Sequence, residues 1–161
     1  MDILQFKGEY RWLSNFWPVE IVFEGVFYPS VEHAYQAAKV DPLQREPFRT
    51  GTAGQAKKLG NSISLCSNWE LIKVSIMRQL LAEKFRIDSP LAKLLISTVP
   101  GQLVEGNNWN DKFWGVCNGS GKNMLGELLM ERRYYLINQS NIGDNVLIIH
   151  RSPMNGEECS G

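Results

Sequence analysis

Residues 29–39 read PSVEHAYQAAK, and this stretch decides how the first half of the chain is organised. Pro29 stops the strand-like segment before it, and Ser30 can serve as the N-cap of a helix over residues 31–40. The Asp-Pro pair at 41–42 ends that helix, because the residue before a proline is pushed out of helical backbone angles. Small side chains are frequent in the helix, so other elements can approach its backbone closely.

Apolar runs and turn signals place the other elements around this helix. Residues 19–23 and 26–28 flank an acidic-glycine pair at 24–25, a pattern that predicts a β-hairpin. Helical spacing of apolar residues and capping signals predict further helices. These helices cover residues 52–59 with Gly60 in the C′ position, residues 69–86, a short segment from Pro90, and residues 122–136, while residues 102–105 are extended and residues 106–121 form a long loop.

These elements predict an α+β fold that is predominantly α, with a small N-terminal β-hairpin, in one domain over residues 1–138. A chain of 161 residues with 43% hydrophobic content buries roughly 70% of its unfolded surface and needs no disulfide or metal to form a core. Residues 139–161 are expected to form a partly disordered C-terminal tail. In that tail the apolar run 146–149 either adds an edge strand or docks on the surface, and residues 152–161 are disordered.

The charge balance and the cysteines narrow the classes of partner. Seventeen Lys and Arg residues offset seventeen Asp and Glu residues, which argues against a protein that neutralises many phosphates of a long nucleic acid. A small phosphorylated ligand needs only one or two local charges. The three cysteines form no CxxC, no His/Cys cluster has metal-ligand spacing, and no apolar run approaches the roughly 20 residues that cross a bilayer. No signal peptide is visible, so we expect a reduced, cytoplasmic protein with no metal, cofactor or membrane contact.

The helix over residues 31–40 carries a first candidate site. At about 100° per residue, Glu32, Tyr35, Gln36 and Lys39 fall within one stripe of the helix. One interpretation is a solvated polar face, which stabilises a helix by only about a few tenths of a kcal/mol. The other is the wall of a cleft, because the stripe directly follows a hairpin at the start of a helix. Periodicity alone leaves both interpretations open.

The stretch LVEGNNWNDKFWGV, residues 103–116, carries a second candidate site. Its glycines and asparagines indicate a loop, which nevertheless contains Trp109, Phe113 and Trp114 together with Glu105 and Asp111. These aromatic side chains can pin the loop onto the core. They can also stack on a base or ribose beside a carboxylate, since base–aromatic stacking contributes about 1–3 kcal/mol. The two interpretations are compatible.

Two glycine-containing stretches could bind phosphate. GSGKN at 119–123 precedes the last predicted helix, where glycines let an anion approach backbone N–H groups. Its spacing is neither that of a P-loop nor that of a dinucleotide-binding fingerprint. GQAKK at 54–58 presents two adjacent lysines that meet either a phosphate or solvent. Near the amino terminus, Asn15 in LSNFWP is either a buried cap or a ligand donor.

Taken together, these segments resemble the NADAR family, also described as YbiA-like. The motifs occur in the family's order and span nearly all of residues 8–136: LSNFWP, the hairpin, YPSVEHAYQAAK, GQAKKLG, the helix from Trp69 with AEKF, LVEGNNWNDKFWGV and GKNMLGELLM. The resemblance implies an α-rich α+β fold and activity on N-glycosidic bonds. The implied reactions are hydrolysis of early riboflavin-pathway intermediates or removal of ADP-ribose from guanine, so the partner is a nucleotide-like small molecule or a modified nucleic-acid base.

The resemblance also implies site residues. The positions that match the family's motifs are Asn15, Glu32, Tyr35, Lys39, Lys57, Asp111, Trp114, Gly121 and Asn123. Among them Glu32, Lys39 and Asp111 are expected to be catalytic. The others, joined by Trp109, are expected to bind the substrate, with Lys57 and the turn at 121–123 holding phosphate.

Cleavage of a ribosyl–nitrogen bond builds positive charge on C1′ and negative charge on the base, so it needs a carboxylate and a proton donor. We expect Glu32 to stabilise the oxocarbenium-like centre or to activate water, and Asp111 to orient the ribose hydroxyls or share the base role. Lys39 is an alternative nucleophile that forms an imine at C1′ if burial lowers its pKa. A non-catalytic module that binds NAD or ADP-ribose in stress or defence signalling would use the same pocket, but the two acidic residues favour catalysis.

Overall fold

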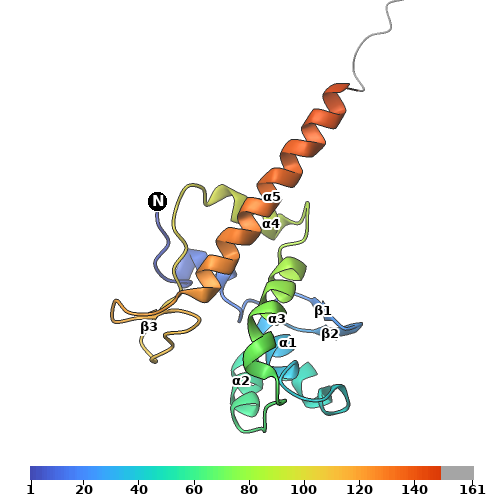
Figure 1. Cartoon of the computed structure of the whole chain (residues 1–161), viewed down its shortest axis with the longest axis vertical. Helices are drawn as coiled ribbons and strands as arrows, with labels where there is room; N and C mark the ends of the chain where they lie inside the picture. Colours follow the sequence, from blue (N-terminus) through green and yellow to red (C-terminus); the bar gives the residue numbers. More distant parts are fainter. Residues whose placement is uncertain (150–161) are drawn as a thin grey trace, which may run out of the picture.

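The computed structural model describes residues 1–149, which form a helical fold with two small sheets (Figure 1). Its α-helices are α1 Val31–Ala37, α2 Ala53–Asn61, α3 Trp69–Lys84, α4 Pro90–Ser97 and α5 Met124–Ile149, and its 3-10 helices are η1 Gly8–Leu13, η2 Pro42–Gln44 and η3 Glu46–Arg49. Its strands are the antiparallel pair β1 Ile21–Phe23 and β2 Val26–Tyr28 and the parallel pair β3 Gly106–Asn107 and β4 Val116–Cys117. The predicted fold class, predominantly α with an early hairpin, is confirmed. None of these helices is long and apolar enough to cross a membrane.

The hairpin forms at the predicted residues. Glu24 and Gly25 have φ angles of 49° and 78°. Positive φ at both central residues is the geometry of a two-residue turn whose twist matches that of the paired strands. Ile21 and Tyr28 lie opposite each other across the pair, and both side chains are buried. The hairpin thus packs on the core and leads the chain directly into α1.

Helix α1 begins at the predicted cap, where Ser30 Oγ accepts a hydrogen bond from the His33 N–H at 3.3 Å. It ends at Ala37, three residues before the predicted end at 40. Every residue of α1 is buried, because α2, α3, η3 and the hairpin all pack against it. Polar side chains on such a helix must find partners or face a cavity.

Helix α2 continues through the glycine that was predicted to end it. Thr52 caps α2 in a capping box with Gln55. Gly60 lies inside the helix and not in the C′ position, so that prediction is wrong. The physical reason for glycine is the close approach of α1: a Cβ on Gly60 would lie 1.9 Å from Gln36 Oε1 and 3.1 Å from Gln36 Cβ.

The core lies between the hairpin and helices α1, α3, α4 and α5. Leu80 and Phe85 from the α3 region, Leu95 from α4 and Leu129 from α5 are fully buried. The amino terminus joins this core through a bridge between Ile3 and Leu103. Residues 102–104 therefore lie beside the N-terminal segment, and this pairing positions the start of the loop that follows.

Helix α5 is longer than predicted at its carboxyl end. It runs from Met124 to Ile149, and its last turns extend away from the rest of the chain (Figure 1). The apolar run 146–149 is helical, so of the two alternatives predicted there, the edge strand is wrong. Four consecutive apolar residues have no period that separates a strand from a helix, which explains the error. The domain boundary expected at 138 falls within α5, and the disorder expected for residues 152–161 lies outside the described residues.

Two glycines of α2 provide a matched test of this packing. Gly60→Ala is expected to lower the free energy of unfolding by about 1–3 kcal/mol, because the added methyl group overpacks the contact with α1. Gly54 is exposed, and its only near atom for a Cβ is Thr52 Oγ1 at 3.8 Å. Gly54→Ala is therefore expected to raise the free energy of unfolding by about 0.4–1 kcal/mol. Urea unfolding followed by circular dichroism measures both, and effects of the same sign would contradict the close approach at Gly60.

Candidate active site

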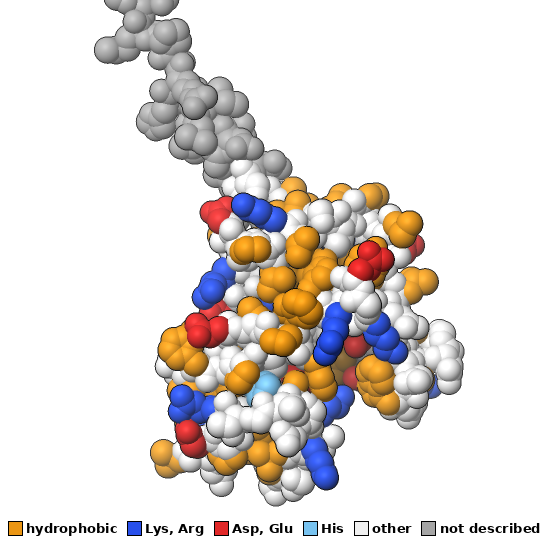
Figure 2. Space-filling view, turned by 180° about the vertical axis from the view of Figure 1, so that it is seen from behind, with side chains coloured by type: hydrophobic (Ala, Val, Ile, Leu, Met, Phe, Trp, Pro, Cys, Tyr) orange, Lys and Arg blue, Asp and Glu red, His pale blue; other side chains and the backbone are white. Residues whose placement is uncertain are grey.

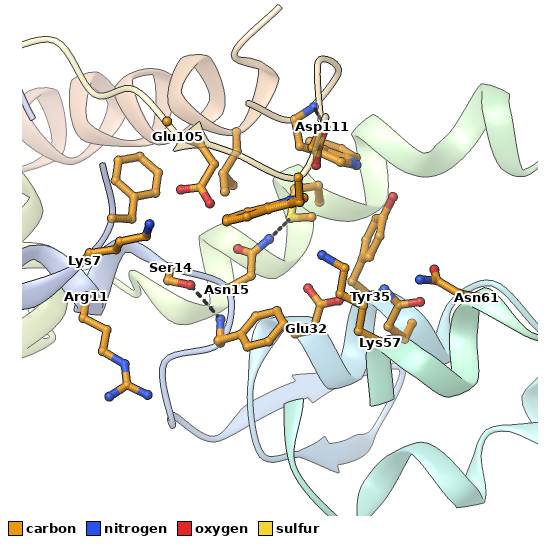
Figure 3. A pocket seen from close by; sticks show the side chains of 18 of the residues that line it. Lys7, Arg11, Ser14, Asn15, Glu32, Tyr35, Lys57, Asn61, Glu105 and Asp111 are labelled. Atoms are coloured by element: carbon orange, nitrogen blue, oxygen red, sulfur yellow. Dashed lines mark hydrogen bonds between the residues drawn. The ribbon is translucent and has the colours of Figure 1, made fainter. Parts of the chain in front are cut away.

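A cavity of about 640 Å³ lies where the N-terminal segment, α1, α2 and residues 105–114 meet (Figure 3). On the surface it is a hollow with acidic side chains in its depth and Lys and Arg side chains around its rim (Figure 2). The predicted site residues that line it are Asn15, Glu32, Tyr35, Lys39, Lys57, Trp109, Asp111 and Trp114. Among residues 1–149, no three His, Cys, Asp or Glu side chains gather closely enough to hold a metal ion.

Glu32 is held in the depth of this cavity with 6% of its surface exposed. Its Oε1 accepts a hydrogen bond from Gln36 Nε2 at 2.7 Å, one helical turn later. Its backbone N–H donates to the Asn15 carbonyl at 3.0 Å. Asn15 Nδ2 donates to Met77 Sδ at 3.5 Å, while the buried Asn15 Oδ1 has no partner within the described residues. That amide oxygen is thus a buried acceptor without a protein donor among the described residues.

Glu32 and Lys39 place two buried ionisable groups on the same wall. Burial raises the pKa of Glu32, and the Gln36 hydrogen bond and the charges of Lys57 and Lys39 oppose this shift. Burial lowers the pKa of Lys39, which the Glu32 charge opposes. Lys39 therefore has a larger fraction of free amine near neutral pH than an exposed lysine has.

Asn107 and Asp111 organise the loop over residues 106–121. Asn107 Nδ2 donates to the carbonyls of Asp111 at 2.7 Å and Val116 at 3.2 Å, and Asn107 Oδ1 accepts from the Asp111 N–H at 3.1 Å. Asp111 Oδ1 then accepts from the N–H groups of Phe113 at 3.1 Å and Trp114 at 2.8 Å. One oxygen of the Asp111 carboxylate is thus used to shape the loop.

The aromatic side chains of this loop divide into two groups. Trp114 packs edge-on against Tyr35 with ring centroids 5.5 Å apart, and against Phe113 at 4.9 Å. Tyr35 also contacts Trp69 at 5.1 Å, so Trp114 and Tyr35 belong to a packed aromatic cluster. Trp109 is different, because half of its surface (50%) is exposed at the cavity. Packing onto the core is therefore confirmed for Trp114, whereas stacking on a base stays a prediction for Trp109.

Trp109 lies between two lysines at the rim. Its ring centroid is 6.0 Å from Lys7 Nζ and 5.7 Å from Lys57 Nζ. Arg11 lines the same side of the cavity as Lys7 (Figure 3), whereas Lys58 is exposed and does not line it. In the part of the chain that the structure describes, none of Lys7, Arg11 and Lys57 forms an ion pair. Their positive charges are therefore free to bind an anion.

The N–H groups at the start of α5, where an anion site was predicted, are engaged by the protein itself. The first N–H groups of a helix bind an anion only if they are unpaired. Here they are paired with the loop, through hydrogen bonds from Lys122 to Lys112, Asn123 to Gly115, Met124 to Phe113 and Leu125 to Trp114, all between 2.8 and 3.3 Å. The loop over residues 106–121 folds back onto the start of α5 and takes up these donors.

Gly121 and Asn123, both predicted to bind substrate, lie outside the cavity and support the loop. A Cβ on Gly121 would lie 2.1 Å from the Gly115 carbonyl oxygen, so only glycine fits there. Asn123 Oδ1 accepts from the Glu105 N–H at 2.9 Å, and its Nδ2 donates to the Leu103 carbonyl at 2.8 Å. Asn123 thereby fixes the backbone that enters the cavity wall.

Several residues of the site were not predicted. Glu105, named in the second candidate stretch but not among the expected site residues, lines the cavity, and burial together with the Asp111 charge raises its pKa to about 7. Lys84 lies behind the wall with 2% exposure and donates from Nζ to the Ser14 carbonyl at 2.7 Å. Burial lowers the pKa of Lys84 to about 7. Its helical spacing from Leu80 was a signal that it lies on the buried face of α3, whereas nothing in the sequence indicated Lys7.

Comparisons with known proteins identify the family of this chain. The chain matches the NADAR domain model over residues 5–137. It is 40% identical over 137 residues to N-glycosidase YbiA of Escherichia coli, a match that covers 81% of this chain and 84% of the relative. It is 34% identical over 135 residues to an N-glycosidase of Nostoc punctiforme, a match that covers 77% of this chain and 84% of the relative. It is 39% identical over 123 residues to a riboflavin biosynthesis protein of Vibrio vulnificus, a match that covers 73% of this chain and 33% of the relative.

The similarity of the fold to a solved structure supports the same family. The NMR structure of the E. coli protein YbiA superposes with a TM-score of 0.76 at 33% identity, covering 97% of this chain and 90% of that one. The family model, the curated relatives and the solved structure all match the part of the chain that builds the cavity. The chain therefore belongs to the NADAR family, and it is an enzyme of the N-glycosidase class.

Proposed function

We propose that this N-glycosidase hydrolyses the bond between a ribose or ADP-ribose and a base, with ADP-ribosylated guanine and ribosylaminopyrimidine intermediates of riboflavin synthesis as candidate substrates. One observation carries the proposal: the cavity of about 640 Å³ has Glu32 and Lys39 buried in its wall and Trp109 between Lys7 and Lys57 at its rim. The names of the relatives, N-glycosidase and riboflavin biosynthesis protein, support this substrate class.

Glu32 is the proposed carboxylate of the reaction. As the C1′–nitrogen bond lengthens, positive charge develops on C1′, and a buried carboxylate stabilises it more than an exposed one does. The hydrogen bond from Gln36 fixes the orientation of this carboxylate. In its charged form Glu32 also accepts the proton of an attacking water, so one group serves both steps.

Lys39 offers a second route. A free amine at Lys39 attacks C1′, the base departs, and the ribose ring opens to an imine that water then hydrolyses. The lowered pKa of Lys39 supports this route, because only the free amine is a nucleophile. In the water route Lys39 remains charged and orients the substrate beside Glu32.

The remaining residues are proposed to bind the substrate. Trp109 stacks on the base, and the free oxygen of Asp111 hydrogen-bonds the ribose hydroxyls. Lys7, Arg11 and Lys57 bind the phosphate groups, a role that the paired N–H groups at the start of α5 cannot fill. This arrangement places the sugar in the acidic depth and the phosphates at the basic rim.

The direct test is incubation with ADP-ribosylated guanosine, NAD and a ribosylaminopyrimidine phosphate, with chromatography of the released base. Glu32→Gln is expected to lower the rate of base release by at least about 100-fold, since one general acid or base contributes about 10²–10⁴-fold. Glu32 acts in its charged form, so the wild-type rate should fall as the pH drops through a value above the ordinary 4.5 of a glutamate. Glu127→Gln, an exposed change on α5, is the matched control. A Glu32→Gln enzyme at the wild-type rate would remove Glu32 from the mechanism.

The imine route predicts covalent trapping. Borohydride added during turnover is expected to reduce the imine and leave a ribosyl adduct on Lys39, visible by peptide mass spectrometry, because the intermediate carries a C=N bond. Lys39→Arg keeps the charge and removes the nucleophile, so it should be inactive by this route. No adduct together with an active Lys39→Arg enzyme would leave only the water route.

Adjacent lysines of α2 test the phosphate rim. Lys57→Ala is expected to raise KM for a phosphorylated substrate about tenfold, because an exposed charge–phosphate contact contributes about 1–2 kcal/mol. The effect should shrink as salt is added. Lys58→Ala removes the same charge one residue away, outside the cavity, and should leave KM unchanged. Equal effects of the two substitutions would show that Lys57 acts only through net charge.

A further inference from the structure

Glu105 enters the cavity from the wall opposite Glu32. It lies between the bridge at Leu103 and strand β3, whereas Glu32 belongs to α1. Figure 3 shows the two carboxyl groups reaching into the same cavity from opposite sides, with Asn15 between them. A substrate bound in this cavity would therefore have one carboxyl group on each side.

The backbone of Glu105 is fixed on every side. Its N–H donates to Asn123 Oδ1 at 2.9 Å, and its carbonyl accepts from the Val116 N–H at 2.9 Å. Gly115 packs directly on it, since a Cβ there would lie 2.2 Å from the Glu105 carbonyl oxygen and 3.1 Å from its Cγ. The loop and the start of α5 thus hold this one side chain in position.

The carboxyl group of Glu105 has a free, buried oxygen. Its Oε2 is shielded from solvent and has no hydrogen-bond partner among residues 1–149. Burial and the charge of Asp111 favour the protonated form, against the opposing charges of Lys57 on α2, Lys7 on the N-terminal segment and Lys84 on α3, and they raise the pKa to about 7. A buried carboxyl that is neutral near pH 7 can donate a proton.

The other two carboxyl groups of the cavity are already engaged as acceptors. Glu32 Oε1 accepts from Gln36, and Asp111 Oδ1 accepts two backbone N–H groups. For Glu32 the hydrogen bond from Gln36 opposes the rise in pKa that burial causes. Glu105, which also lines the cavity, is the one whose Oε2 has no such donor among the described residues.

We propose that Glu105 is the general acid that protonates the departing base. The inference rests on the proposed function, because it assigns the proton donor of that reaction. The C1′–nitrogen bond breaks, its electron pair stays on the base nitrogen, and the Glu105 O–H proton moves to that nitrogen. Water attacks C1′ from the side of Glu32, which takes the water proton. The base leaves as a neutral N–H compound, the sugar gains a hydroxyl, and proton exchange with solvent restores both carboxyl groups.

The acid also selects the kind of base that the enzyme releases. An amine nitrogen is a poor leaving group as an anion and requires a proton as its bond to C1′ breaks. A pyridinium-linked base, as in nicotinamide mononucleotide, leaves as a neutral molecule without one. Loss of Glu105 should therefore slow cleavage of amine-linked substrates far more than cleavage of pyridinium-linked ones.

The test compares wild type, Glu105→Gln and the control Glu127→Gln on the amine-linked substrate that the wild type cleaves. Glu105→Gln is expected to lower kcat by about 10²–10⁴-fold with little change in KM. The wild-type kcat should fall as the pH rises through about 7, where Glu105 loses its proton, and this descending limb should be absent in Glu105→Gln. Any turnover of nicotinamide mononucleotide should change by less than threefold.

The results distinguish a failure of the Glu105 assignment from a failure of the proposed function. A Glu105→Gln enzyme within threefold of wild type, or a slow one that keeps the descending limb, would overturn the assignment of Glu105. If the variant does not fold, the wild-type profile decides, because a flat kcat between pH 6 and 8 also overturns it. A wild-type enzyme that releases no base from any of the substrates contradicts the proposed function instead, and leaves Glu105 without a reaction to catalyse.

Discussion

Helix α1 is enclosed on all sides, and this constraint determines most of what surrounds it. A helix without a solvent-facing side can carry polar residues only if each one has a partner or a cavity. Ser30 and the Gly51 carbonyl satisfy the two ring nitrogens of His33, at 2.7 Å and 3.2 Å. Gln36 donates a hydrogen bond to one oxygen of Glu32, and the other polar residues of this stripe, Tyr35 and Lys39, line the cavity. The surroundings of α1 therefore contain buried polar groups within an otherwise hydrophobic core, and the site lies where these groups are not paired internally.

The loop over residues 106–121 has a structural role that does not depend on substrate. It closes the amino terminus of α5 with its own carbonyl groups and is itself braced by Asn107 and Asp111. The glycines and asparagines that make it resemble a flexible ligand-binding loop are used for close backbone contacts and for internal hydrogen bonds. Its rigidity holds Glu105 and Trp109 at fixed positions above α1.

The elements with strong local signals could be predicted from the sequence. The hairpin at Glu24-Gly25, the cap at Ser30 and the start of α4 at Pro90 all depend on residues next to one another in the chain. Of the nine positions that match the family's motifs, all but Gly121 and Asn123 line the cavity. What these signals share is that a few neighbouring residues decide the outcome.

Features that depend on distant contacts could not be predicted in this way. Local sequence predicts that Gly60 ends a helix, but the close approach of α1 is the reason for glycine there. Local sequence likewise predicts an anion site before α5, but the carbonyl groups of the loop accept hydrogen bonds from those N–H groups. The burial of Lys84 depends on its contact with Ser14, seventy residues earlier in the chain. Glu105 is likewise a surface carboxylate or a buried acid according to the packing around it, which local sequence does not specify.

Gln36 connects the packing of two helices to the chemistry of the cavity. The side chain that donates to Glu32 is the one that α2 approaches so closely that position 60 has no room for a methyl group. A larger residue at 60 would have to displace the glutamine, and a shorter residue at 36 would release the carboxylate. We therefore expect positions 36 and 60 to change together among relatives. The same side chain supports both the α1–α2 contact and the orientation of Glu32.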